Sequence, residues 1–354
     1  MVKKILMSGN EAIAEGALEA GCPFYAGYPI TPQNEVPAYM AQHMPEKGRV
    51  FIQAESELAA VNMVFGAAAA GARAMTSSSS PGISLKQEGI SYLAGAELPA
   101  VIVNVMRGGP GLGNIAPAQS DYFQATRGGG HGDYHCIVLA PFSVQEAYEL
   151  TILAFDLADK YRNPAIILGD GLLGQMMEPL RLADGRPKAQ NLKLKPWALT
   201  GCRKRKPNII KSFYLEEGAL EKFNLKLQKK YQVIYNKEQR YEGLFLEDAK
   251  VILVAYGTMA RVGRAVVKRL RQKGKKIGLI RPITLWPFPD KIFKQLLKSA
   301  KKPRFLAVEM SYGQMLQDVK LACEGKLPVE FLGRSGGGMP TEEEIINKIN
   351  RFAR

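Results

Sequence analysis

The chain has 354 residues, of which 46% are hydrophobic and 8% aromatic, and its net charge at pH 7 is +15. The length predicts two domains, because single hydrophobic cores stop growing before about 300 residues. No stretch approaches the ~18 uninterrupted apolar residues of a membrane-spanning helix, and residues 1–10 contain no cleavage-like segment. We therefore expect a cytoplasmic globular protein without a signal peptide or a membrane partner.

Residues 1–185 alternate short apolar runs with helical stretches. Strands that read as continuous apolar runs and are separated by helices are typical of a parallel sheet covered on both faces. We expect an N-terminal α/β domain here, in which Ser143 is the N-cap of a helix. The predicted strands are residues 51–54, 101–105, 136–140 and 165–168, and the predicted helices are residues 57–71 and 144–160.

Residues 186–245 are predicted to form a basic linker. From Arg186 to Arg240 there are 15 basic residues against four acidic ones, including the run RKRK at residues 203–206. A basic run can bind nucleic acid, but interleaved aromatic residues, a helix-turn-helix pattern and zinc-ligand spacing are missing here. We expect a solvated linker or a docking face for an acidic partner, and no nucleic-acid partner.

Residues 246–354 begin a second α/β pattern. The predicted strands are residues 251–255, 277–280 and 305–308. The predicted helices are residues 260–273, with Gly274 as a stop signal, and a short helix that starts at Thr341. This alternation indicates a second α/β domain.

The four cysteines lie far apart, at Cys22, Cys136, Cys202 and Cys323. No pair has the Cys-x-x-Cys spacing of an iron–sulfur or zinc site. We expect buried free thiols, so any electron-transfer cluster would belong to another polypeptide.

A carboxylate at the start of an alanine-rich helix is the most informative feature of the sequence. Glu57 directly follows a predicted buried strand, and Gly66 stands nine residues after it. Helices composed mostly of small residues are often only tightly packed interface helices. A carboxylate at the carboxyl edge of a sheet, however, lies where α/β proteins bind ligands. Glu55 is the alternative carboxylate, although a surface position is the simpler interpretation for it.

Two loops are the other informative features of residues 1–185. Residues 27–32 read GYPITP, a pattern typical of a rigid turn with an N-cap. Residues 105–114 read VMRGGPGLGN, which lacks the glycine spacing and the Lys-Ser/Thr pair of nucleotide-binding loops. Arg107 at this strand end suits a bidentate grip on a carboxylate, with a structural ion pair as the alternative. Residues 119–121 follow on the same edge, while His131 and His135 are expected to be polar loop residues.

Together these motifs resemble the alpha-type subunits of the thiamine-diphosphate-dependent 2-oxoacid:ferredoxin oxidoreductases. Residues 80–88 and 94–99 look like the same subunits, and residues 255–289 look like a transketolase C-terminal-type domain. The resemblance covers both predicted domains and is weakest over residues 186–245. It implies an N-terminal pyrimidine-binding-type domain with a parallel sheet flanked by helices, followed by a transketolase-C-terminal-like α/β domain. Within the family, the type that uses 3-methyl-2-oxobutanoate is favoured over the similar 2-oxoglutarate type.

The resemblance implies roles for particular residues. Glu57 would hydrogen-bond the N1′ nitrogen of the aminopyrimidine, which favours the imino tautomer and lets the 4′ nitrogen take the C2 proton of the thiazolium. Thr31 and Arg107 would bind the 2-oxoacid. The remaining residues expected at the cofactor are Tyr28, Pro29, Ser80 and Gly82.

The resemblance also divides the cofactor between two chains. In this family the diphosphate and Mg²⁺ are held by a Gly-Asp-Gly element and a downstream asparagine in a separate domain. Residues 169–171 read GDG, but no Asn-Asn element follows and Asn191 comes earlier than the family's spacing requires. We therefore interpret Asp170 as a strand-end turn residue and expect no metal in this chain. The diphosphate and Mg²⁺ would belong to a beta-type subunit, and [4Fe-4S] clusters to gamma and ferredoxin-like delta subunits.

The reaction implied is oxidative decarboxylation of a 2-oxoacid to an acyl-CoA and CO₂, with CoA as co-substrate and ferredoxin as electron acceptor. The favoured substrate is 3-methyl-2-oxobutanoate, and 2-oxoglutarate and pyruvate are the alternatives. Two other functions stay open: half of a non-oxidative thiamine-dependent decarboxylase, and a non-catalytic interaction protein whose basic segment binds nucleic acid.

Overall fold

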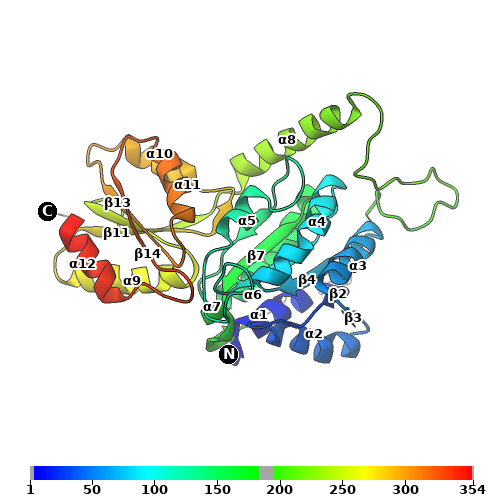
Figure 1. Ribbon diagram of the computed structural model, residues 1–354, viewed down its shortest axis with the longest axis horizontal. Coiled ribbons are helices and arrows are strands. Elements are labelled where there is room, and N and C mark those ends of the chain that lie inside the picture. The colour runs from blue at the N-terminus through cyan, green and yellow to red at the C-terminus, as the bar shows by residue number, and fades with distance from the viewer. Residues whose placement is uncertain (1–3, 183–194, 353–354) are drawn as a thin grey trace.

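The computed structural model describes residues 4–182 and 195–352. Two sheets lie next to each other along the long axis of the molecule, each with helices packed against it (Figure 1). We call them the N-terminal sheet and the C-terminal sheet. This arrangement confirms the predicted α/β class with two parallel-dominated sheets.

The N-terminal sheet has seven strands, six of which run parallel. The seventh, β12, is antiparallel to β6 although it comes from the C-terminal part of the chain. Strands β4, β5 and β7 are buried along their whole length, which the apolar runs of β5 and β7 predict. In order across the sheet the strands are β12 (Thr284–Trp286), β6 (Ile137–Leu139), β7 (Ala165–Asp170), β5 (Val101–Met106), β4 (Ala74–Ser78), β2 (Phe24–Gly27) and β3 (Val50–Gln53).

Two helix pairs pack against this sheet, α1 with α6 and α3 with α4. Ser143 caps α6 by accepting a hydrogen bond from Glu146 N, as predicted. A short antiparallel ribbon of β1 (Lys4–Ser8) and β8 (Met177–Arg181) lies beside them. The helices are α1 (Gly9–Glu19), α2 (Glu35–Glu46), α3 (Glu57–Ala69), α4 (Ser80–Gly95), α5 (Tyr122–Arg127), α6 (Val144–Tyr161) and α7 (Gly171–Gln175).

The C-terminal sheet has five strands, of which only β9 is antiparallel to its neighbour. Its order is β14 (Val329–Gly333), β13 (Arg304–Glu309), β10 (Val251–Val254), β11 (Ile277–Pro282) and β9 (Tyr241–Leu244). The helices of this part are α9 (Gly257–Gln272), α10 (Asp290–Leu297), α11 (Gln314–Ala322) and α12 (Glu342–Phe352).

The segment predicted as a basic linker is more structured than expected. It contains α8 (Ala219–Lys237), and β9 within it belongs to the C-terminal sheet. Leu227, Tyr231 and Ile234 of α8 are buried at helical spacing, so this helix packs through an apolar stripe. We propose the division of the chain at residues 185 and 245 as domain boundaries, the first of which lies outside the described residues.

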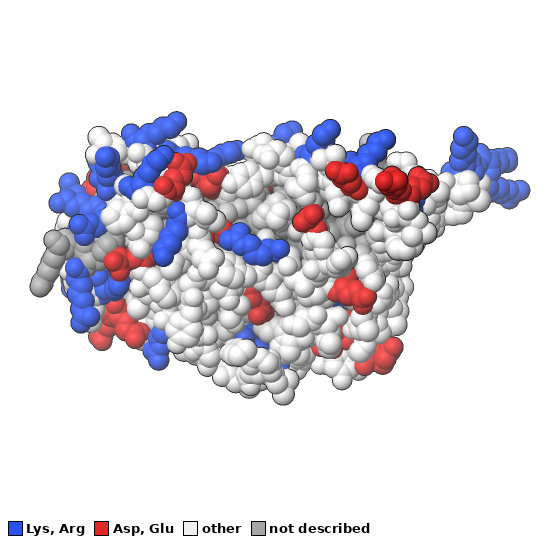
Figure 2. All heavy atoms as spheres, turned by 45° about the horizontal axis from the view of Figure 1, so that its top comes forward, with Lys and Arg blue, Asp and Glu red and all other residues white. Residues whose placement is uncertain are grey.

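Basic residues of this segment lie at the end of a projection from the body of the protein. Residues 203–206 are all exposed, and Figure 2 shows Lys and Arg gathered at the tip of the projection.

Cys202 beside them is exposed as well, so the expectation of buried thiols is wrong for this cysteine. It holds for the other three, which are free and buried. No helix of the described residues is long and apolar enough to cross a membrane.

Buried polar contacts join the two sheets. The Gln119 side chain donates to Tyr256 O at 3.0 Å and accepts from Met310 N at 2.9 Å. At the end of β7, Asp170 accepts from Thr258 Oγ1 at 2.7 Å. These contacts lie at the carboxyl edge of the N-terminal sheet, so the second part of the chain is fixed close to the predicted site.

Candidate active site

The site is built at the carboxyl edge of the N-terminal sheet, where neighbouring parallel strands end together. The loop of residues 28–34 follows β2, and Glu57 follows β3. Ser80 begins the helix after β4, and Arg107 directly follows β5. Since β3, β2, β4 and β5 are adjacent, residues far apart in the sequence meet at one edge of the sheet.

Glu57 is the first residue of α3, and its side chain is buried. Ser56 caps the helix by accepting from Ala59 N at 3.1 Å, which fixes the direction of the first turn. Glu57 is only 5% exposed, and in the described part of the chain its carboxylate accepts one long hydrogen bond, from Ser78 Oγ at 3.4 Å. A carboxylate can accept about four hydrogen bonds, so Glu57 has capacity for a further donor. Glu55, the alternative carboxylate, is exposed.

Gly82 of α4 is the close neighbour of this carboxylate. A Cβ atom at this position would lie 2.4 Å from Glu57 Oε1 and 2.1 Å from Ser78 Oγ. Only glycine therefore leaves room for the carboxylate in its present place. Gly82 and Glu57 are brought together by the packing of α3 against α4.

Arg107 binds two loops through backbone carbonyl groups. Its Nη1 donates to Thr31 O at 2.9 Å and its Nη2 to Leu112 O at 3.0 Å. Its Nε is buried and has no hydrogen-bond partner among the residues that the structure describes. The guanidinium is thus held in place by neutral acceptors, and its charge suits an anionic group bound between the two loops.

Ser80 connects the Arg107 strand end to the half-buried carboxylate of Asp121. Its hydroxyl accepts from Arg107 N at 3.0 Å and donates to Asp121 Oδ2 at 2.6 Å. Asn104 also donates to Asp121 Oδ2, at 2.9 Å. Burial raises the pKa of Asp121 above its usual value, and the hydrogen bonds from Ser80 and Asn104 oppose that rise. The sequence offers no signal for Asn104, which lies within an apolar strand.

The loop after β2 is tied to β4 beneath it. Gln33 donates to Tyr28 O at 3.3 Å and accepts from Ser77 Oγ at 2.5 Å. The side chain of Thr31 is half-buried, and its hydroxyl accepts a hydrogen bond from Asn34 Nδ2 at 3.4 Å. Tyr28 is exposed, and so is Pro29 beside it. The loop is therefore anchored at its base and presents its tip outward.

Lys86 is a residue of the site that sequence reasoning missed. It lies on α4 and is fully buried, and its Nζ donates to Thr76 Oγ1 at 2.9 Å and to Glu57 O at 3.3 Å. Burial lowers the pKa of Lys86 to about 7, against a smaller opposing effect of the Glu57 charge. A signal was present, since Gly82, Lys86 and Gly89 stand at helical spacing on one face of α4.

Three other residues were weighed from the sequence: Asp170, His131 and His135. Asp170 Oδ1 accepts from Leu172 N and Leu173 N, both at 3.1 Å, so it caps α7. His131 is exposed, as expected. His135 also lies in the loop before β6, but it is half-buried: its ring stacks on Trp286, with centroids 4.5 Å apart, and burial lowers its pKa.

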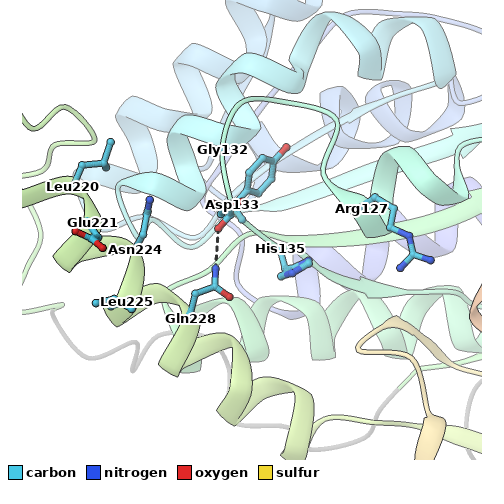
Figure 3. Close-up of a pocket in the computed structure, with 10 residues that line it drawn as sticks. Arg127, Gly132, Asp133, His135, Leu220, Glu221, Asn224, Leu225 and Gln228 are labelled. Atoms are coloured by element: carbon cyan, nitrogen blue, oxygen red, sulfur yellow. Dashed lines mark hydrogen bonds between the residues drawn. The ribbon is translucent and has the colours of Figure 1, made fainter. Parts of the chain in front are cut away.

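A cavity of about 600 Å³ lies between α8 and the loop of residues 128–135 (Figure 3). Gln228 spans it by donating to Asp133 O at 3.2 Å. Its lining includes Arg127, Tyr134 and His135, but none of the residues around Glu57 and Arg107. We therefore place the candidate active site at the sheet edge and not in this cavity.

Comparison with protein families gives two matches, which together cover most of the chain. The family model described as "Pyruvate flavodoxin/ferredoxin oxidoreductase, thiamine diP-bdg" matches residues 15–240. The chain belongs to this family. A second family model, pyruvate:ferredoxin oxidoreductase core domain II, matches residues 249–345. The resemblance seen in the sequence motifs is thereby confirmed over both parts of this oxidoreductase subunit.

Two proteins similar to this chain have names that contain a 2-oxoacid. The chain is 52% identical to the ketoisovalerate oxidoreductase subunit VorB of Methanothermobacter marburgensis, over 98% of this chain and 97% of the relative. It is 39% identical to the 2-oxoglutarate synthase subunit KorA of Archaeoglobus fulgidus, over 90% and 91% of the two chains.

Two solved structures have a fold similar to that of this chain. The 2-oxoglutarate:ferredoxin oxidoreductase from Magnetococcus marinus, with 2-oxoglutarate, coenzyme A and succinyl-CoA bound, superposes with a TM-score of 0.88 at 29% identity. The match covers 99% of this chain and 65% of that one. A split-gene transketolase, at 14% identity and a TM-score of 0.59 over 98% and 97% of the two chains, shares the fold alone.

Proposed function

We propose that this chain is the alpha-type subunit of a thiamine-diphosphate-dependent 2-oxoacid:ferredoxin oxidoreductase. The complex would convert a 2-oxoacid and CoA to an acyl-CoA and CO₂ and pass two electrons to ferredoxin. The relatives named above are subunits of such enzymes. The observation that carries the proposal is the buried Glu57 carboxylate, which accepts only one long hydrogen bond within residues 4–182 and 195–352.

Glu57 fits the aminopyrimidine of the cofactor. When bound, thiamine diphosphate would supply a carbon that is nucleophilic once deprotonated and a ring that serves as an electron sink for decarboxylation. Glu57 would accept a hydrogen bond from N1′, because its carboxylate is buried and has unused acceptor sites. Gly82 leaves the space that this geometry needs, and Ser80, Tyr28 and Pro29 complete our set of cofactor residues.

Arg107 and Thr31 would bind the oxoacid. Arg107 is oriented by the carbonyl groups of Thr31 and Leu112, and its remaining N–H groups can meet a carboxylate without moving the side chain. The Thr31 hydroxyl would add a hydrogen bond to the carbonyl or the carboxylate of the substrate. Both residues lie on loops at the same edge as Glu57.

We place the diphosphate and Mg²⁺ on a beta-type subunit. In this chain, the carboxylate of Asp170 already accepts hydrogen bonds from α7 and from Thr258, which leaves it poorly suited to a metal. Gamma and ferredoxin-like delta subunits would carry the [4Fe-4S] clusters that pass electrons to ferredoxin. The active site would then lie between chains.

The favoured substrate is 3-methyl-2-oxobutanoate, since the ketoisovalerate-type relative shares 52% of its residues with this chain. The alternative is 2-oxoglutarate, the substrate in the name of the more distant relatives. The purified complex can be tested for CoA-dependent viologen reduction with 3-methyl-2-oxobutanoate, 2-oxoglutarate and pyruvate. A markedly higher kcat/KM for either of the last two would refute the branched-chain assignment.

The role of Glu57 is tested with Glu57→Gln in the assembled complex, and Glu55→Gln is the matched control. Glutamine keeps the size of the side chain but removes the negative charge that N1′ needs. We expect a loss of activity of about 10²-fold or more for Glu57→Gln and wild-type activity for Glu55→Gln. Full activity of the Glu57→Gln complex would refute the proposed site.

A further inference from the structure

Lys86 occupies a position where an apolar residue would be expected. Its side chain is fully buried between α4, α3 and β4, and taking an ammonium group out of water is costly. No ion pair of Lys86 with a carboxylate is found in the described part of the chain, where its partners are the Thr76 hydroxyl and the Glu57 carbonyl. An apolar side chain of similar volume would make this interface more stable.

Gly82, Lys86 and Gly89 form a stripe along one face of α4. This stripe brings the charge of Lys86 close to Glu57. On the same face of α4, Gly82 meets the Glu57 carboxylate, and a Cβ at Gly89 would lie 2.5 Å from Val61 Cγ1 of α3. The two glycines let the helices approach closely at both ends of the stripe. The lysine between them then reaches under the first turn of α3 to β4.

The groups that act on Lys86 come from each element packed against it. Glu57 from α3 is the charged group that acts on Lys86, and Thr76 from β4 is a neutral acceptor. Lys86 approaches Glu57 from its backbone side. The carboxylate of Glu57 therefore stays free to face a ligand.

We propose that Lys86 is a positioning residue for Glu57, an inference that rests on the function proposed above. Its ammonium group holds the first turn of α3 against β4, and its positive charge interacts favourably with the buried Glu57 carboxylate, which would face the aminopyrimidine. Lys86 touches neither cofactor nor substrate. It acts through the carboxylate that does.

The test is calorimetric titration of the cofactor-free complex with thiamine diphosphate and Mg²⁺ between pH 6 and pH 9. In the wild-type complex we expect the affinity to fall as the pH rises and Lys86 loses its proton. Lys86→Met keeps the length of the side chain but removes the charge. We expect roughly tenfold weaker binding at pH 6.5 and no fall between pH 6.5 and pH 9. Ile90→Met, a buried change on the same helix, controls for altered packing and should bind as the wild type does.

Thr76→Val provides a second measurement if Lys86→Met does not assemble. It leaves the lysine in place but removes the acceptor that stabilises the ammonium group, so the fall in affinity should move to lower pH. Wild-type affinity and pH dependence in Lys86→Met, or an unmoved pH dependence in Thr76→Val, would overturn the inference. Failure of the proposed function is separate, because it would appear as full activity and cofactor binding in Glu57→Gln.

Discussion

Replacing Gly82 with alanine tests whether the Glu57 carboxylate works where the structure places it. The new Cβ would lie 2.4 Å from Glu57 Oε1 and 2.1 Å from Ser78 Oγ, whereas ordinary contacts begin near 3.4 Å. The carboxylate must therefore move by roughly 1 Å, and a displacement of that size can lower the rate by about 10²-fold. Overpacking should also reduce the free energy of unfolding by about 1–3 kcal/mol.

The assay compares the assembled Gly82→Ala complex with the wild type by CoA-dependent viologen reduction and by thermal unfolding. Gly263→Ala is the matched control, since it makes the same change within helix α9. A Cβ there would meet only ordinary contacts, at 3.5 and 3.7 Å. We expect the control to keep full activity. Wild-type turnover and cofactor affinity in Gly82→Ala would refute the placement of Glu57 against Gly82.

Three further predictions concern Arg107, Thr258 and Lys86. Arg107→Lys cannot hold both loop carbonyl groups, so the KM for the 2-oxoacid should rise about 10- to 100-fold in steady-state assays; an unchanged KM would contradict a substrate role. Thr258→Val removes the hydroxyl that donates to Asp170 at 2.7 Å, and urea unfolding should show a loss of about 1–3 kcal/mol that Thr258→Ser restores. Folded Lys86 releases its proton near pH 7 and the unfolded chain near pH 10.5, so the unfolded chain binds more protons between these values and the free energy of unfolding rises with pH there. In Lys86→Met that rise should be smaller in thermal unfolding at pH 7 and pH 9, and an equal rise would contradict burial of the ammonium group.

Local patterns were sufficient for the elements that carry the site. The run of apolar residues before Arg107 predicted β5, and the residues before Glu57 predicted a strand that ends directly ahead of α3. The sequence also placed Glu57 and Arg107 after strands of one predicted sheet. No strand was predicted ahead of Thr31, so β2 and the hydrogen bond from Arg107 to Thr31 O were found only in the structure. The roles of these residues remain predictions.

The basic segment shows where local patterns were insufficient. Its charge and prolines indicated a solvated linker, but Leu227, Tyr231 and Ile234 form a buried stripe on α8. The stripe has helical periodicity within a strongly charged helix. Whether such a stripe packs against the protein depends on the surface that it meets.

The sequence by itself determined the two α/β patterns and the place of Glu57 at the start of a lean helix after a strand, because periodicity and capping act over a few residues. Only the tertiary structure decided what each polar side chain faces. Lys86 reaches the Glu57 carbonyl across 29 residues of chain, and Thr258 reaches Asp170 across 88. Such contacts depend on how helices and sheets pack against one another, and no local pattern contains that information.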